Sequence, residues 1–227
     1  MLSDNIKKDL ITSGATVVGF AGVKKVLSYE IAHLENAISI GVDRNLNENT
    51  IGLLIRLQKR VAQYLKCIGY KYLCIPPDSD RIRGTFISKL YSLFNHKVAA
   101  TSAGLGWVGR NGLLINPEYG PRLSLATVLT NAPLILDNPV EFSLCGECTL
   151  CVDFCPSSAL TGSDWSRYEP FVELVRTSYC DIYKKNSRAV KGKPNCGLCI
   201  NICPYGRKSK YKSISPSRSS ELRSSEP

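Results

Sequence analysis

Eight of the ten cysteines in this 227-residue chain lie between positions 145 and 203, and their spacing constrains the fold more than any other feature. The first four, Cys145, Cys148, Cys151 and Cys155, follow the pattern C-x2-C-x2-C-x3-C-P. That run is typical of bacterial ferredoxins, in which three thiolates hold one [4Fe-4S] cluster and the fourth reaches a second cluster. The first motif therefore predicts a second set of cysteines farther along the chain.

The second set begins at Cys180. A C-x2-C-x3-C-P run at Cys196, Cys199 and Cys203 lacks one thiolate, which Cys180 supplies from upstream. We therefore predict two clusters with crossed ligands. The predicted ligands of cluster 1 are Cys145, Cys148, Cys151 and Cys203. Those of cluster 2 are Cys155, Cys180, Cys196 and Cys199.

Structural zinc and disulfides are the alternative interpretations of these cysteines. Zinc uses paired C-x2-C motifs, but four cysteines within eleven residues exceed what two tetrahedral sites require. Disulfides require an exported chain, and we identify no export signal, so we expect a cytoplasmic protein. The two remaining cysteines, Cys67 and Cys74, are predicted to be small buried apolar residues.

Composition places the chain in the ordinary globular class, with 44% hydrophobic and 21% charged residues. Its longest weakly polar stretch, residues 11–23, is shorter than the roughly 18 to 20 residues that cross a bilayer, so we expect no membrane span. The net charge of +10 is compatible with nucleic acid, an anionic membrane surface or an anionic partner. The serine-rich segment 207–227 carries six basic and two acidic residues, and we expect it to be a disordered tail.

The region before the cysteines predicts an α+β body covering residues 1–140, followed by a double-cluster module over 141–206. The expected helices cover residues 3–13 and 48–67, and the expected strands cover 15–21, 37–42 and 70–75. Residues 78–95 suggest a polar turn and a short helix. Residues 112–115 and 123–129 frame a loop rich in turn residues and are expected to form a hairpin.

A glycine-rich stretch, Gly104-Leu-Gly106-Trp-Val-Gly109, matches the pattern G-x-G-x-x-G. A dinucleotide-binding loop must follow a strand and open a helix, whereas helical character precedes this stretch and a strand is expected after it. We expect these glycines to let the backbone lie flat against a planar group or against the cluster module. Trp107 would pack over that contact.

The glycine-tryptophan stretch and the cysteine runs together, from about Lys97 to Tyr205, resemble the epoxyqueuosine reductases. The resemblance implies a cobalamin-binding α+β domain related to flavin nitroreductases, fused to a ferredoxin-like module with two [4Fe-4S] clusters that delivers electrons to cobalt. That family reduces an epoxide on a modified tRNA base. The cofactor-binding residues implied here are Gly104, Gly106, Trp107, Gly109, Arg110 and Asn111.

The sequence departs from the family where its proton-donating aspartate is found, in a D-x-x-P-x-x-[ED] stretch. An ungapped count back from the glycine-tryptophan stretch places Leu90, Leu93 and His96 at the corresponding positions. Because leucine donates no proton, we expect a substrate other than epoxyqueuosine. The residues that could supply a proton instead are His96, Lys97 and Tyr91.

Three functions remain open from the sequence. The first is an oxidoreductase that receives electrons from a donor such as a ferredoxin or flavodoxin and passes them to a cobalamin-type cofactor or substrate. The second is an electron-transfer protein that docks a partner enzyme and performs no chemistry itself. The third is a nucleic-acid-binding module, for tRNA or another nucleic acid, in which the clusters are structural and the basic tail contacts phosphate.

Overall fold

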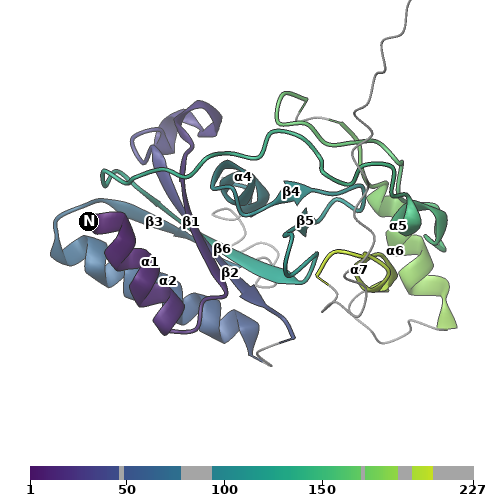
Figure 1. Cartoon of the computed structure of the whole chain (residues 1–227), viewed down its shortest axis with the longest axis horizontal. Coiled ribbons are helices and arrows are strands. Elements are labelled where there is room, and N and C mark those ends of the chain that lie inside the picture. The colour runs from purple at the N-terminus through teal and green to yellow at the C-terminus, as the bar shows by residue number, and fades with distance from the viewer. Residues whose placement is uncertain (46–48, 78–93, 170–171, 189–195, 207–227) are drawn as a thin grey trace, which may run out of the picture.

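The centre of the body is a four-stranded sheet in which every neighbouring pair of strands is antiparallel (Figure 1). The computed structural model describes residues 1–45, 49–77, 94–169, 172–188 and 196–206. From edge to edge, the strands are β1 (Val17–Gly22), β2 (Asn36–Asp43), β6 (Leu123–Thr130) and β3 (Tyr72–Ile75). Although β6 is last in the chain, it lies in the interior of the sheet, so the fold depends on long-range pairing.

Two helices, α1 (Leu2–Thr12) and α2 (Thr50–Cys67), cover one face of this sheet (Figure 1). Alternate residues of the strands point toward them and form one apolar cluster with the helices. The fully buried members of that cluster include Leu10, Ile38, Ile40, Leu54, Leu57, Leu65 and Val128. The buried Gln58 of α2 reaches β3 and β6, where Nε2 donates to the carbonyl oxygens of Ile75 at 2.6 Å and Thr127 at 2.8 Å.

Helix α4 (His96–Ser102) covers the opposite face of the sheet. It begins at Asn95, whose side chain accepts a hydrogen bond from the Lys97 backbone N–H. Its end packs so closely on β1 that a Cβ at Gly19 would lie 2.8 Å from the carbonyl oxygen of Ala103. Two short 3-10 helices, η1 (Lys24–Val26) and η2 (Tyr29–Ile31), connect β1 to β2. The body therefore has three layers, with the sheet in the middle.

The predicted hairpin of residues 112–115 with 123–129 is wrong. Strand β5 (Leu114–Ile115) pairs instead with β4 (Trp107–Val108), while β6 joins the main sheet. The physical reason is that both faces of β6 are covered by apolar layers, which a two-stranded hairpin cannot provide. The intervening turn is closed by Asn116, whose Oδ1 accepts from two backbone N–H groups of the loop.

The cysteine-rich module lies beyond the β4–β5 pair, at one end of the sheet (Figure 1). Its helices are short: α5 (Leu150–Asp153), α6 (Thr177–Asn186) and α7 (Leu198–Asn201). Isolated bridges between residues 142 and 166 and between residues 160 and 175 tie its loops together. Helices α5 and α7, which carry Cys151 and Cys199 of the two cysteine runs, lie in contact.

The other sequence predictions for the body are confirmed in place and type. The predicted helices are α1 and α2, and the predicted strands over 15–21, 37–42 and 70–75 are β1, β2 and β3. The expectations for most of 78–95 and for 207–227 fall outside the described residues. Within the described part of the chain, no helix has the length and apolar content that crossing a membrane requires. Cys67 contradicts its prediction, because it is exposed at the end of α2.

Candidate metal centres and the adjoining cavity

The eight clustered cysteines line two separate cavities, four cysteines to each. The first cavity, called here the first cage, is lined by Cys145, Cys148, Cys151 and Cys203. The second cavity, the second cage, is lined by Cys155, Cys180, Cys196 and Cys199. These two sets are the quartets that the crossed assignment predicts. In each cysteine run, the last cysteine, which precedes proline, lines the cage of the other run.

Local backbone geometry explains how each C-x2-C motif turns its thiols inward. Gly146 and Gly197 each follow the first cysteine of a motif, and both have a positive φ, 57° and 70°. A residue with a Cβ rarely adopts this conformation, so glycine permits the tight turn that precedes each short helix. The cysteines of each motif therefore project from a turn and the helix after it toward one cavity.

The thiols in each cage influence one another electrostatically. Burial raises the pKa of Cys151 to about 12, and the charges of Cys145, Cys199, Cys203 and Cys148 also raise it. Burial likewise raises the pKa of Cys199 to about 11, with additional effects of the cysteines in the second cage. The two cages adjoin, since Asn111 lines both of them and α5 contacts α7. Metal ions that bind these thiols as thiolates must displace protons.

The spread of four thiols around each cavity suits an iron–sulfur cubane. All ten cysteines are free rather than paired as disulfides. Among the described residues, no three Cys, His, Asp or Glu side chains are grouped as they would be around one metal ion. A cubane instead places each thiolate on a different iron, which suits four cysteines spread around one cavity. Arg110, which lines the first cage, also has a buried Nε with no partner in the described structure.

The glycine-tryptophan stretch joins the body to both cages. Trp107 Nε1 lies 3.4 Å from the Sγ of Cys145, and Arg110 Nη1 donates to the carbonyl oxygen of Cys148 at 2.8 Å. Asn111 Nδ2 donates to the carbonyl oxygen of Cys199 at 3.2 Å. The three side chains predicted to bind a cofactor therefore contact the cysteine loops.

The glycines of this stretch approach the protein's own backbone. A Cβ at Gly104 would lie 2.6 Å from the carbonyl oxygen of Asn138, and one at Gly106 would collide with the carbonyl of Ile115. Gly109 lies against the side chain of Ile115. As the sequence suggested, α4 precedes this stretch and β4 follows the second glycine, an order that differs from a dinucleotide-binding loop.

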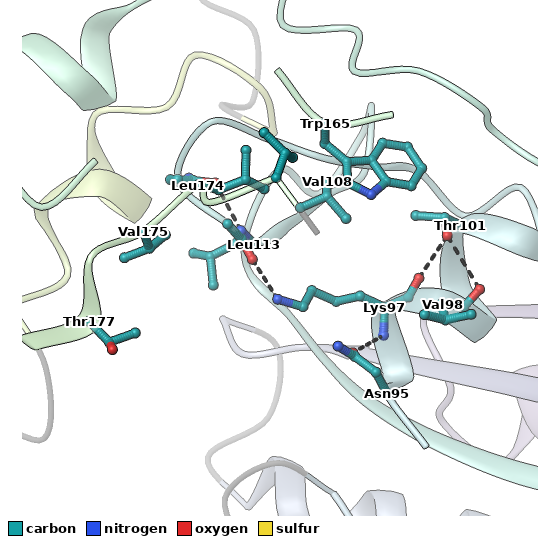
Figure 2. A pocket seen from close by; sticks show the side chains of 13 residues that line it. Asn95, Lys97, Val98, Thr101, Val108, Leu113, Trp165, Leu174, Val175 and Thr177 are labelled. Atoms are coloured by element: carbon teal, nitrogen blue, oxygen red, sulfur yellow. Dashed lines mark hydrogen bonds between the residues drawn. The ribbon is translucent and has the colours of Figure 1, made fainter. Parts of the chain in front are cut away.

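A third cavity, of about 490 Å³, lies between the body and the module (Figure 2). Its volume is within the range of small-molecule sites. Helix α4 and the β4–β5 turn form one wall, and residues from the segment 165–177 form the other. The lining residues are Asn95, Lys97, Val98, Thr101, Val108, Asn111, Gly112, Leu113, Trp165, Val172, Leu174, Val175 and Thr177. Asn111 lines this cavity and both cages.

The structure separates the predicted proton donors. His96 is 1% exposed, with Nε2 2.7 Å from the carbonyl oxygen of Pro76 and Nδ1 2.8 Å from Oγ1 of Thr127. Since a carbonyl only accepts, Nε2 carries a proton, and the ring links α4 to the sheet. Lys97 lines the cavity, where its Nζ donates to the carbonyl oxygen of Gly112 at 2.8 Å (Figure 2). Tyr91, with Leu90 and Leu93, lies outside the described residues.

Comparison with known proteins identifies the module and relates the chain to one enzyme family. Residues 144–206 match the family described as a 4Fe-4S double cluster binding domain. The epoxyqueuosine reductase of Lactococcus garvieae is 38% identical over 111 residues, and that of Cyclobacterium marinum is 39% identical over 117 residues. Over about half of its length, this chain is similar to the epoxyqueuosine reductases. The matched parts cover 48% and 49% of this chain, but only 31% and 36% of those relatives.

Solved structures agree on the fold over most of the chain. The epoxyqueuosine reductase of Streptococcus thermophilus aligns with a TM-score of 0.62 at 20% identity, covering 89% of this chain and 65% of that protein. A catabolic reductive dehalogenase aligns with a TM-score of 0.68 at 21% identity, covering 89% and 31%. At these identities the likeness concerns the fold alone. It confirms the predicted α+β body followed by a double-cluster module.

The sequence analysis did not identify the wall of the cavity that the segment 165–177 forms. Trp165, Leu174 and Val175 lie in the spacer between the two cysteine motifs, and no motif marks them. Asp164, which pairs with Arg110 at 2.8 Å, lies in the same spacer. The only available signal was the apolar run Phe171-Val172-Glu-Leu174-Val175, which is long enough to cover a surface.

Proposed function

We propose that this chain is an oxidoreductase in which two [4Fe-4S] clusters pass electrons to a redox-active ligand in the cavity of Figure 2. The observation that carries the proposal is the position of Asn111, which is 6% exposed and lines both cages and the cavity. Because the three compartments meet at one side chain, an electron can move between them over short distances. The ligand is a cobalamin-type cofactor or a reducible substrate.

The eight clustered cysteines are the proposed ligands of the two clusters. Each cluster, when bound, supplies one-electron redox chemistry. Cluster 1 occupies the first cage and cluster 2 the second, an assignment supported by the cysteines that line each cavity and by the unsatisfied Nε of Arg110. The side chains of Trp107 and Ile115, each 1% exposed, form apolar packing beside the first cage and keep water from that side.

The walls of the cavity indicate which ligands it can take. Val98, Val108 and Leu113 present an apolar surface that a planar organic group can cover. Lys97 is the one basic residue among the described lining residues, and no acidic residue is among them. The cavity therefore favours an apolar ligand with a polar or anionic group near Nζ of Lys97. That ammonium is also the proposed source of a proton.

A structure of similar fold supports the cobalamin form of the proposal. A reductive dehalogenase aligns with a TM-score of 0.67 at 20% identity, and its structure suggests a mechanism for B12-dependent dehalogenation. Another aligned structure is an epoxyqueuosine reductase with a tRNA stem loop. For this chain we propose a substrate other than epoxyqueuosine, because leucines occupy positions 90 and 93, where the family pattern has an aspartate and proline.

The proposed electron donor is an acidic carrier of the ferredoxin or flavodoxin class that docks on α6. This helix carries Cys180 and exposes Tyr179 and Ile182, at 48% and 56%, and it has Lys184 and Lys185 in its last turn. An apolar centre with basic residues at its edge complements a small acidic protein, and the net charge of +10 favours the same encounter. Reduction by the carrier should slow in Ile182→Glu and in high salt.

The test is anaerobic reconstitution of the full chain with iron, sulfide and hydroxocobalamin, followed by gel filtration. We expect corrin absorbance bands to elute with the protein, together with about eight iron atoms for two cubanes. Leu113→Trp, which fills the cavity, should abolish corrin retention, whereas Val26→Trp, at a side chain 54% exposed, should not. Equal retention in both variants would reject this cavity. Reducible clusters without corrin binding or turnover of a substrate would favour an electron-transfer protein.

A further inference from the structure

An arginine beside the first cage has one hydrogen-bond donor without an acceptor. Arg110 Nη1 donates to the carbonyl oxygen of Cys148, and Nη2 donates to Asp164, both at 2.8 Å. These two bonds fix the plane of the guanidinium, which is only 11% exposed. Within the described structure, its buried Nε has no partner, although the side chain lines the first cage. A buried N–H without an acceptor is costly, so an acceptor in the cage would stabilise it.

A second donor reaches the same cage from the same loop. The indole Nε1 of Trp107 lies 3.4 Å from the Sγ of Cys145, a proposed ligand of cluster 1. The ring is 1% exposed and packs edge-on against Tyr205, with centroids 4.8 Å apart. Because the indole is buried in a cluster with Ile115 and Cys203, its N–H is fixed toward that sulfur rather than free to turn to solvent.

We propose that Trp107 and Arg110 act together as tuning residues that raise the reduction potential of cluster 1. This inference rests on the proposed function, since it requires a cluster in the first cage. Reduction adds one negative charge to the cluster and its thiolates. A fixed N–H donor on a ligand sulfur and a guanidinium beside the cage stabilise that charge, so both favour the reduced state. Both residues belong to the body, so the body sets the potential of the cluster nearest to it.

The experiment is an anaerobic potentiometric titration of the reconstituted full chain, followed by electron paramagnetic resonance. Trp107→Phe removes the indole N–H and retains an aromatic ring, and Arg110→Gln removes the charge. Tyr205→Phe is the matched control for the first variant, because Tyr205 also lines the first cage and packs on Trp107, but its hydroxyl donates to the carbonyl of Leu144. Arg167→Gln is the control for the second, since Arg167 bonds Ser102 across the same interface and lines neither cage.

We expect one of the two midpoint potentials to become more negative in Trp107→Phe and in Arg110→Gln, while the other potential stays unchanged. Both controls should keep the wild-type values. Iron and sulfide counts distinguish failure of the proposed function from failure of the tuning role. If the wild-type chain assembles no clusters, the proposed function fails. If clusters assemble and neither variant shifts a potential relative to its control, the tuning role is wrong.

If Arg110→Gln loses cluster 1, a milder variant shows whether Arg110 tunes the cluster or only holds the cage. Arg110→Lys keeps the positive charge without the Nε donor, and we expect a shift smaller than that of Arg110→Gln, with both clusters present. If Arg110→Lys and Trp107→Phe also lose cluster 1, the two residues hold the cage rather than tune it. That outcome would overturn the inference.

Discussion

The sheet body and the cysteine module are stabilised in different ways. In the body, both faces of β2 and β6 are buried, and the helices contribute fully buried side chains such as Leu10, Leu54 and Leu57. In the module, no residue of the described helices α5, α6 or α7 is buried. A segment with so little core needs another source of stability, and metal coordination is the usual one in small domains. We therefore expect the body to fold by apolar burial and the module to depend on its clusters.

The largest expected effect is the loss of a cluster ligand. Cys203→Ser should remove cluster 1, lowering the iron content by about half and increasing hydrogen exchange across residues 145–203. Exchange in β2 and β6 should stay slow, because their protection comes from the sheet. Cys67→Ser is the control, since Cys67 is exposed and lines neither cage. Unchanged iron in Cys203→Ser would contradict the ligand assignment.

A core substitution in the body should give the reverse pattern. Leu54 is fully buried in α2, and Leu54→Ala should lower the free energy of unfolding of the body by about 2–5 kcal/mol. Denaturant titration with far-ultraviolet circular dichroism measures this change. Iron content under native conditions should remain at the wild-type level. If Leu54→Ala releases iron while the body remains folded, the two regions are not stabilised separately.

A smaller effect is expected at the contact between the regions. Gly112 has a φ of 70°, and a Cβ there would lie 2.7 Å from Cγ2 of Val175 in the module. Gly112→Ala should therefore push the β4–β5 turn away from the module and speed the loss of iron in air. Gly69→Ala is the matched control, because Gly69 also has a positive φ, 83°, but has open space around it. Both variants share the cost of a strained backbone, about 1 kcal/mol, so only Gly112→Ala should affect the clusters.

The smallest expected effect is a gradual dependence on pH. Burial raises the pKa of Cys151 to about 12 and that of Cys199 to about 11, so protons compete with iron for both sulfurs at every pH below these values. Lowering the pH favours the thiols, and the fraction of iron retained against a chelator should fall steadily as the solution is acidified. The body should show no matching transition by circular dichroism. Iron retention that increases toward acid would contradict this sign.

The sequence predicted the members of each cage because the constraint on them is local. Two C-x2-C motifs and two C-P endings leave few ways to group Cys145 through Cys203 once a cubane is assumed. The strands β1, β2 and β3 were equally accessible, since their residues carry a continuous apolar pattern. Sequence reasoning placed β6 correctly as a strand but gave it the wrong partner, because its neighbours in the sheet lie far away in the chain.

The contacts across the two regions were also beyond the sequence. Trp107, Arg110 and Asn111 were identified as functional positions, but their partners at Cys145, Cys148 and Cys199 follow only from tertiary packing. The apolar character of cysteine also predicted a buried Cys67, whereas α2 ends there and leaves it exposed. The contacts and burial of such residues depend on where a helix or strand ends and on which segments pack against it.

The central claim is that eight cysteines hold two [4Fe-4S] clusters as crossed quartets. The most direct measurement is the iron and acid-labile sulfide content of the anaerobically reconstituted full chain, with electron paramagnetic resonance of the reduced protein. We predict about eight iron and eight sulfide atoms per chain, with signals from two interacting clusters, and about half of each in Cys203→Ser and in Cys180→Ser. Stoichiometric zinc without sulfide, or disulfides mapped among the eight cysteines, would contradict the claim.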